Sequence, residues 1–168
     1  MVDFAALGEG RPLPVAAAAF CCLGTTMKRA GSREAFRAAD FDAVLNFARA
    51  ALAGGTRRFF VVTAAGADAR SRIFYNRVKG EVEDALRGLA FESLGIARPS
   101  LLLGDRGESR PFEHMAIVGA RALAPLFKPF AMRPIEARTV ARALLAMAES
   151  PVAGVKVQDN AALHVLGA

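Results

Sequence analysis

Short apolar runs that alternate with helical patterns constrain the fold more than any other feature of this sequence. Each run is continuous and apolar, as is typical of strands buried on both faces of a parallel sheet. The runs cover residues 15–23, 58–63, 94–98 and 155–157. The stretches between them repeat apolar residues at helical spacing, over residues 36–53, 73–88, 112–127 and 136–148. Strands that alternate with helices predict an α/β fold, with a parallel sheet joined by crossover helices.

The composition is that of one globular domain covering residues 1–168. Hydrophobic residues make up 54% of the chain and charged residues 23%, which is enough for a core and unlike a disordered chain. The net charge of +6 favours polyanions or phosphate ligands. The basic residues are scattered, without the Lys/Arg runs or interleaved aromatic residues of a nucleic-acid surface, so we expect no nucleic-acid partner.

Cysteine and histidine are scarce. Cys21 and Cys22 are adjacent, and neighbours in a strand point to opposite faces, which disfavours a disulfide. We interpret them as small buried residues of a cytoplasmic protein, and a start without a basic signal-like region favours the same location. His114 and His164 are the only histidines and lie far from the cysteines, so we expect no metal site. The run at residues 15–23 is too short to span a bilayer, so we expect no membrane partner.

The stretch at residues 71–83 holds the only tyrosine, Tyr75, four residues before Lys79. In a helix these two side chains lie one turn apart on one face. A cation beside a phenol lowers its pKa below the usual ~10 and makes acid–base chemistry accessible, so we expect a lowered Tyr75 pKa. The same spacing also occurs on ordinary amphipathic helices. The pattern further predicts that Val82 points inward and Glu83 outward.

Four segments together resemble one protein family. They are FCCLGTT at 20–26, FFVVTAAGADARS at 59–71, FYNRVKGEVE at 74–83 and ARPSLLLGDRGESRP at 97–111. They are similar to the carboxyl-terminal two-thirds of an atypical short-chain dehydrogenase/reductase. The resemblance is strongest to the Tat-interacting oxidoreductase family and its bacterial nucleoside-diphosphate-sugar epimerase-like relatives. It implies a Rossmann-like sheet that binds NAD or NADP, and an oxidoreductase or epimerase-like activity on a small carbonyl or alcohol substrate.

The resemblance also implies catalytic roles for three residues. Tyr75 would be the acid–base residue, and Lys79 would hold the nicotinamide ribose and lower the Tyr75 pKa. The family carries its catalytic serine at the end of the preceding strand, where this chain has Thr63. A threonine can still donate and accept through its hydroxyl, although its branched side chain is stiffer. A threonine that only bonds to backbone is an equally good interpretation.

Further residues would contact the cofactor. Leu23 and Gly24 match positions that lie along the cofactor in such relatives, and Leu102 and Arg110 match positions that contact it. Gly24 and Thr25 follow a predicted strand, where small and hydroxyl residues allow backbone amides to approach a ligand. Arg110 could instead belong to an ordinary solvated turn.

The glycine-rich fingerprint that opens the family fold is absent. We therefore expect a domain that lacks the first strand, first helix and second strand, and that binds its cofactor more weakly. The residues at 15–23 would then form an exposed strand edge, which predicts a homodimer or another oligomer through that edge. The alternative to an enzyme is a non-catalytic regulatory or interaction module on the same fold.

Overall fold

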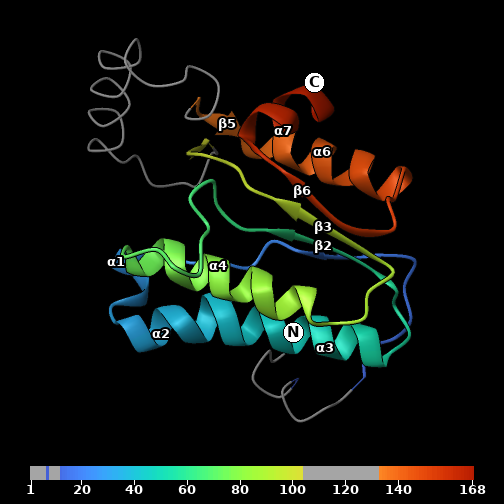
Figure 1. Ribbon diagram of the computed structural model, residues 1–168, viewed down its shortest axis with the longest axis horizontal. Helices are drawn as coiled ribbons and strands as arrows, with labels where there is room; N and C mark the ends of the chain where they lie inside the picture. The colour runs from blue at the N-terminus through green and yellow to red at the C-terminus, as the bar shows by residue number, and fades with distance from the viewer. Residues whose placement is uncertain (1–6, 8–11, 104–132) are drawn as a thin grey trace.

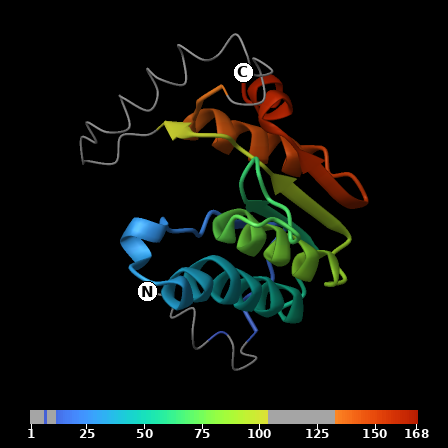
Figure 2. The ribbon, with the colours of Figure 1, turned by 60° about the vertical axis from the view of Figure 1, so that its left-hand side comes forward.

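A four-stranded parallel sheet with helices on both faces forms the centre of the computed structural model (Figures 1 and 2). The structure describes Leu7 and residues 12–103 and 133–168. The neighbouring strands follow the order β1 (Ala19–Cys21), β2 (Arg58–Val62), β3 (Ser93–Ala97) and β6 (Gly154–Gln158). Every adjacent pair is parallel. The predicted α/β fold is therefore confirmed.

Alternation along β2 separates the core into two layers. Phe59 and Val61 point to one face of the sheet, where they pack against α3 (Ala43–Ala53) and α4 (Phe74–Arg87). Phe60 points to the other face, which α6 (Ala137–Glu149) and α7 (Asn160–Leu166) cover. This is the period of two expected of a strand buried on both faces.

A π-helical turn interrupts the long helical segment before β2. The segment consists of α2 (Arg33–Arg37), the π turn η2 (Ala38–Asp42) and α3, and it follows the short helix α1 (Met27–Ala30). Ser32 caps the amino end by accepting a hydrogen bond from the Ala35 amide at 3.0 Å. The sequence pattern predicted the helix and its end at the following glycines but not the π turn. Such turns often occur at functional sites.

The loop after β2 rests directly on α4. A Cβ at Gly80 would lie 2.0 Å from the Ala69 nitrogen and 2.2 Å from the Asp68 carbonyl carbon. The Asp68 amide also donates to the Asn76 carbonyl at 3.1 Å. The absence of a side chain at Gly80 thus brings this loop against the helix that carries the tyrosine and the lysine.

One amide side chain joins the two segments that flank residues 104–132. Asn160 is buried; its Oδ1 accepts from the Ser100 amide at 2.9 Å, and its Nδ2 donates to the Arg133 carbonyl at 2.8 Å. Beside it, β4 (Leu102–Leu103) and β5 (Ile135–Glu136) pair in parallel. The helix predicted at residues 112–127 lies outside the described residues.

The first predicted strand is shorter and less buried than expected. Only Ala19–Cys21 is a strand, and within the described residues it pairs with β2 alone. Val15 is 72% exposed and Phe20 38%. The preceding segment follows the end of α3 instead of the sheet, because the Leu13 amide donates to the Ala50 carbonyl at 3.0 Å and the Ala16 amide to Thr56 Oγ1 at 3.1 Å.

In the described part of the chain, none of the helices is long and apolar enough to cross a bilayer.

We expect the purified chain to associate through the β1 edge, because Phe20 is partly exposed there and β1 has one strand neighbour in the described region. Light scattering measures this association directly. A monomer that persists at high protein concentration would contradict the prediction.

Gly80→Ala should lower the free energy of unfolding by about 2 kcal/mol, because a methyl group there overlaps the loop backbone at Asp68 and Ala69, which would have to shift. Urea unfolding followed by circular dichroism at fixed protein concentration measures the change. Gly88→Ala, at the carboxyl end of the same helix, is the control, because an added Cβ there meets its nearest atom at 3.4 Å. It should leave stability unchanged or raise it by up to about 1 kcal/mol. Equal effects of the two substitutions would contradict this account of the loop.

Candidate active site

Tyr75 and Lys79 lie one turn apart on α4, beside the carboxyl ends of β1 and β2. Tyr75 is half-buried, and its ring packs against Phe36 of α2 with 5.4 Å between ring centroids. Lys79 is buried, with 5% of its side chain exposed. The expected helix and the shared face are therefore present, and the lysine is far less accessible than on an ordinary surface helix.

Asp40 is the partner of the buried lysine. Its Oδ1 lies 2.7 Å from Lys79 Nζ, and its own side chain is fully buried. Its Oδ2 accepts a hydrogen bond from the Thr25 amide at 2.8 Å. Asp40 sits in the π turn η2, so this one carboxylate joins three parts of the chain: η2, α4 and the segment after β1.

Sequence reasoning missed Asp40, although a signal was present. Asp40 follows Phe36 by four residues and precedes Val44 by four, which places a carboxylate on the apolar stripe of the helix. Acidic side chains are almost never fully buried unless they are paired. A charged residue at a core position was therefore a reason to search for a buried cation.

Gly24 lies directly against this ion pair. A Cβ at Gly24 would be 3.3 Å from Asp40 Oδ1 and 3.4 Å from Lys79 Nζ. The structure therefore brings Gly24 and Thr25, two of the expected cofactor contacts, to the expected dyad. Leu23 is half-buried and packs against the core on the α3–α4 face of the sheet.

The pKa of Tyr75 shifts in the direction opposite to the one we expected. Burial raises the pKa of Tyr75 above its usual value, and the negative charge of Asp40 raises it further. The expectation of a lowered pKa considered Lys79 without its partner. Because the Lys79 ammonium is paired with Asp40, the negative charge of Asp40 largely cancels the effect of the ammonium on the phenol.

Thr63 follows β2 and is hydrogen-bonded to a buried carboxylate. Its Oγ1 donates to Glu83 Oε1 at 2.7 Å and lies 3.4 Å from the Ala97 carbonyl oxygen. An ionised carboxylate only accepts, so the single hydroxyl hydrogen of Thr63 is used in this bond. The hydroxyl oxygen remains able to accept.

The prediction that Glu83 points outward is wrong. Glu83 is 1% exposed and accepts a two-pronged pair of bonds from Arg98, with Nε–Oε1 at 2.9 Å and Nη2–Oε2 at 2.6 Å. Arg87 Nη2 lies 3.5 Å from Oε2. Arg98 follows the end of β3, so a guanidinium is available to hold a carboxylate at this place in the core, and the hydrogen bonds to Glu83 raise the pKa of Arg98.

Two other expected cofactor contacts lie away from this cluster or beyond the described residues. Leu102 lies in β4, past the carboxyl end of β3, with an exposed side chain. Arg110 falls outside the described residues. No group of histidine, cysteine, aspartate and glutamate residues within residues 12–103 and 133–168 could hold a metal ion.

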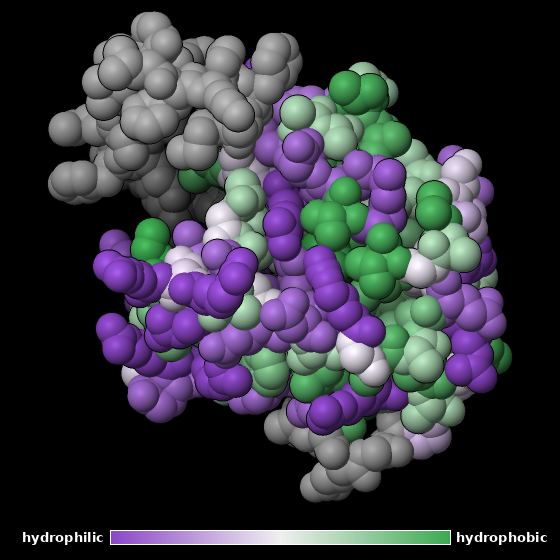
Figure 3. Space-filling model, in the orientation of Figure 1, coloured by the Kyte–Doolittle hydropathy of each residue, from purple (hydrophilic) through white to green (hydrophobic). Residues whose placement is uncertain are grey.

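The surface over α1, α2 and the start of α4 is mainly hydrophilic (Figure 3). Basic side chains outnumber acidic ones in this part of the chain. Exposed there are Lys28, Arg29, Arg33, Arg70 and Arg72, against Glu34 and Asp68. The surroundings of the candidate site thus favour a negatively charged ligand.

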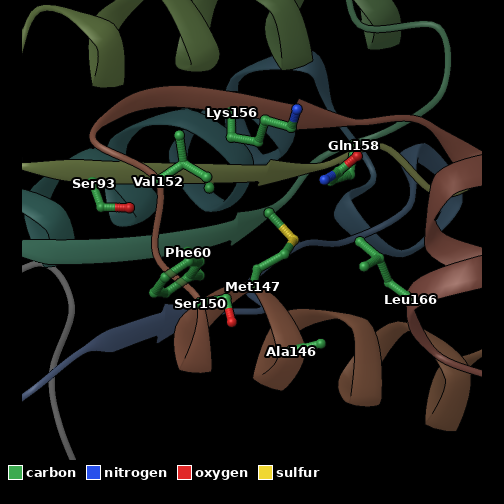
Figure 4. A pocket seen from close by; sticks show the side chains of 10 residues that line it. Phe60, Ser93, Ala146, Met147, Ser150, Val152, Lys156, Gln158 and Leu166 are labelled. Atoms are coloured by element: carbon green, nitrogen blue, oxygen red, sulfur yellow. The ribbon is translucent and has the colours of Figure 1, made fainter.

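A small pocket of about 110 Å³ lies elsewhere, between the sheet and α6 (Figure 4). Phe60, Ser93, Met147 and Lys156 are among its lining side chains, and Ser93 begins β3. The lining extends to Gln158, the last residue of β6. The pocket includes none of the candidate site residues.

Comparison with known proteins identifies the family. No protein-family profile matches the chain. Protein HTATIP2 of Rattus norvegicus is 39% identical to it over 169 residues, which cover 99% of this chain and 69% of that protein. The chain belongs to the HTATIP2 family. The predicted relation to atypical short-chain dehydrogenases/reductases is confirmed.

A fungal relative corrects the predicted location. The mitochondrial protein fmp52 of Emericella nidulans is 41% identical over 110 residues, covering 66% of this chain and 47% of that protein. The chain thus spans about half the length of this relative. The prediction of a cytoplasmic protein is contradicted, because fungal relatives are named as mitochondrial proteins.

A solved structure supports the fold at low sequence identity. A short-chain dehydrogenase/reductase superfamily protein from Agrobacterium tumefaciens, crystallised with bound NAD, superimposes with a TM-score of 0.66 and 18% identity. The match covers 97% of this chain and 67% of that one. The predicted Rossmann-like fold is confirmed.

Thr63→Val should lower the free energy of unfolding by about 2 kcal/mol, because it removes a hydrogen bond to a buried charged group while keeping the shape of the side chain. Thr63→Ser is the matched control: it keeps the hydroxyl and should lose less. Urea unfolding of both variants makes the comparison, and a valine variant as stable as the serine variant would show that the bond to Glu83 contributes nothing.

Proposed function

We propose that this chain is an NAD(P)-dependent oxidoreductase of the atypical short-chain dehydrogenase/reductase type that acts on a small carbonyl or alcohol substrate. The observation that carries the proposal is the arrangement of Tyr75 and Lys79 on α4, with Gly24 packed against the buried ion pair. NAD bound to the Agrobacterium protein, which shares the fold, supports the same class of cofactor here.

The residues around the ion pair fit a dinucleotide. Lys79 carries three N–H donors, more than its ion pair with the single Asp40 Oδ1 atom can use, so donors would remain for ribose hydroxyls. Gly24 has no side chain between the backbone after β1 and the ion pair, so a ligand held by Lys79 would lie next to that backbone. The exposed basic residues nearby favour the negatively charged pyrophosphate. The nicotinamide would supply or accept the hydride at the substrate carbon.

Tyr75 would supply the proton in the reducing direction. Its raised pKa keeps the phenol protonated at neutral pH, so it can donate to the carbonyl oxygen as the carbon receives hydride. A proton from solvent then restores the phenol. Thr63, whose hydrogen is engaged with Glu83, would act on the substrate as an acceptor only.

The alternative is a non-catalytic regulatory or interaction module on the same fold. Two observations favour it: the pKa of Tyr75 is raised and not lowered, and the Thr63 hydroxyl is bonded to Glu83. An active enzyme of this type needs the phenolate form of the tyrosine in the oxidising direction, and a raised pKa lowers the fraction of phenolate at neutral pH. Turnover therefore separates the two functions, whereas cofactor binding alone does not.

Calorimetry with NADH and NADPH, and absorbance assays with a panel of small aldehydes and ketones, test the proposal. Tyr75→Phe should keep cofactor binding and lower turnover by about 100-fold or more, the usual loss for a general acid. Lys79→Ala should weaken cofactor binding. Lys156→Ala removes an exposed lysine of β6, away from the site, and should change neither quantity.

The outcomes assign the function. Absence of binding of either dinucleotide at millimolar concentration would overturn the proposal. Binding without turnover of any carbonyl substrate would favour the non-catalytic module. A Tyr75→Phe variant as active as the parent chain would remove the tyrosine from the mechanism.

A further inference from the structure

Asp40 is placed where only a specific local conformation could bring it. The π turn lets the Ala43 amide donate to the Ala38 carbonyl, five residues back, which widens the helix at this point. The fully buried carboxylate in this turn contacts Lys79 of α4 through one oxygen and the Thr25 amide through the other. Both oxygens are therefore engaged, with partners from two different segments.

Stability alone is a weak explanation for this arrangement. Removing two charges from water costs several kcal/mol per ion, and a buried ion pair often contributes no more than apolar residues of the same volume. This free-energy cost arises at Asp40 in the π turn η2, beside Lys79 and Tyr75 of the candidate site. A role in that site accounts for the position of the pair.

We propose that Asp40 is a positioning residue of the site: it fixes the Lys79 ammonium against Gly24 and Thr25, and it sets the charge that acts on the Tyr75 phenol. The part that concerns Tyr75 chemistry rests on the proposed function. The part that concerns positions and charges does not, because it follows from the contacts of Asp40 themselves.

The titratable groups that interact with Asp40 come from two elements. Lys79 of α4 forms an ion pair with it, and Tyr75 of α4 and Cys21 of β1 interact with its charge. Burial raises the pKa of Cys21 to about 11, so the thiol is neutral at physiological pH. Thr25 contributes an uncharged amide. The balance of charge beside the phenol therefore depends on Asp40 and Lys79.

Two substitutions should move the Tyr75 titration in opposite directions. Asp40→Asn keeps the shape and removes the negative charge, so the Tyr75 pKa should fall. Lys79→Met removes the compensating cation and leaves Asp40 charged, so the Tyr75 pKa should rise. The double variant Asp40→Asn/Lys79→Met should lie between the two.

Ultraviolet absorbance measures this titration without a label, because Tyr75 is the only tyrosine and the chain has no tryptophan. Asp42→Asn is the matched control: Asp42 belongs to the same π turn but is exposed and makes no side-chain capping bond. It should leave the Tyr75 midpoint unchanged. Circular dichroism of each variant establishes that it is folded.

Shifts of opposite sign in the two single variants would support the proposal, and an unchanged or raised midpoint in Asp40→Asn would overturn it. If Asp40→Asn does not fold, the double variant still decides: a midpoint that does not lie below that of Lys79→Met would show that the charge of Asp40 does not act on the phenol. The titration needs neither cofactor nor substrate. An inactive chain with the expected shifts would therefore refute the proposed function and leave the role of Asp40 intact.

Discussion

The arrangement of the candidate site depends on one buried ion pair, between Lys79 and Asp40. Both side chains are almost completely withdrawn from solvent, and the charges lie 2.7 Å apart. Without the carboxylate, an ammonium at this depth would be uncompensated, and an uncompensated buried charge destabilises a fold by several kcal/mol. The pair therefore determines where α4 lies against the π turn, and with it where Tyr75 lies relative to the segment after β1.

Glu83 is a second buried carboxylate at the candidate site, and it is also paired with a cation. Tyr75, Lys79 and Glu83 are spaced by four residues, so they form a polar stripe along one face of α4. Asp40 neutralises the lysine and Arg98 the glutamate, and each partner belongs to a different element. The helix that carries the candidate acid–base residue is thus held by buried ion pairs at two points along its length, in addition to apolar packing.

The sequence predicted the architecture well because periodicity reports burial. The runs at 58–63 and 94–98 became strands β2 and β3, and the tyrosine helix begins and ends within one residue of its expected bounds.

Burial of Glu83 was missed because helical spacing shows which face of the helix a residue occupies. It does not show whether an arginine of another element lies close enough to pair with that residue. The Tyr75 pKa was missed for a related reason: the charge near a group depends on contacts between distant segments, here Asp40 and Lys79, which no local pattern contains. The run at 15–23 was overestimated because hydrogen bonds to α3 and Thr56 compete with the sheet for its backbone.

The amide of Asn160 has a consequence for how this fold can change over evolution. The Asn160 side chain binds both the Ser100 amide and the Arg133 carbonyl, so it holds together the two ends of the stretch between those residues. Once the ends of such an excursion are fixed, doubling its length costs only about 0.6 kcal/mol in closure entropy. A change in the length of the intervening stretch would therefore alter this closure cost little, while the amide of Asn160 continues to hold its two ends together.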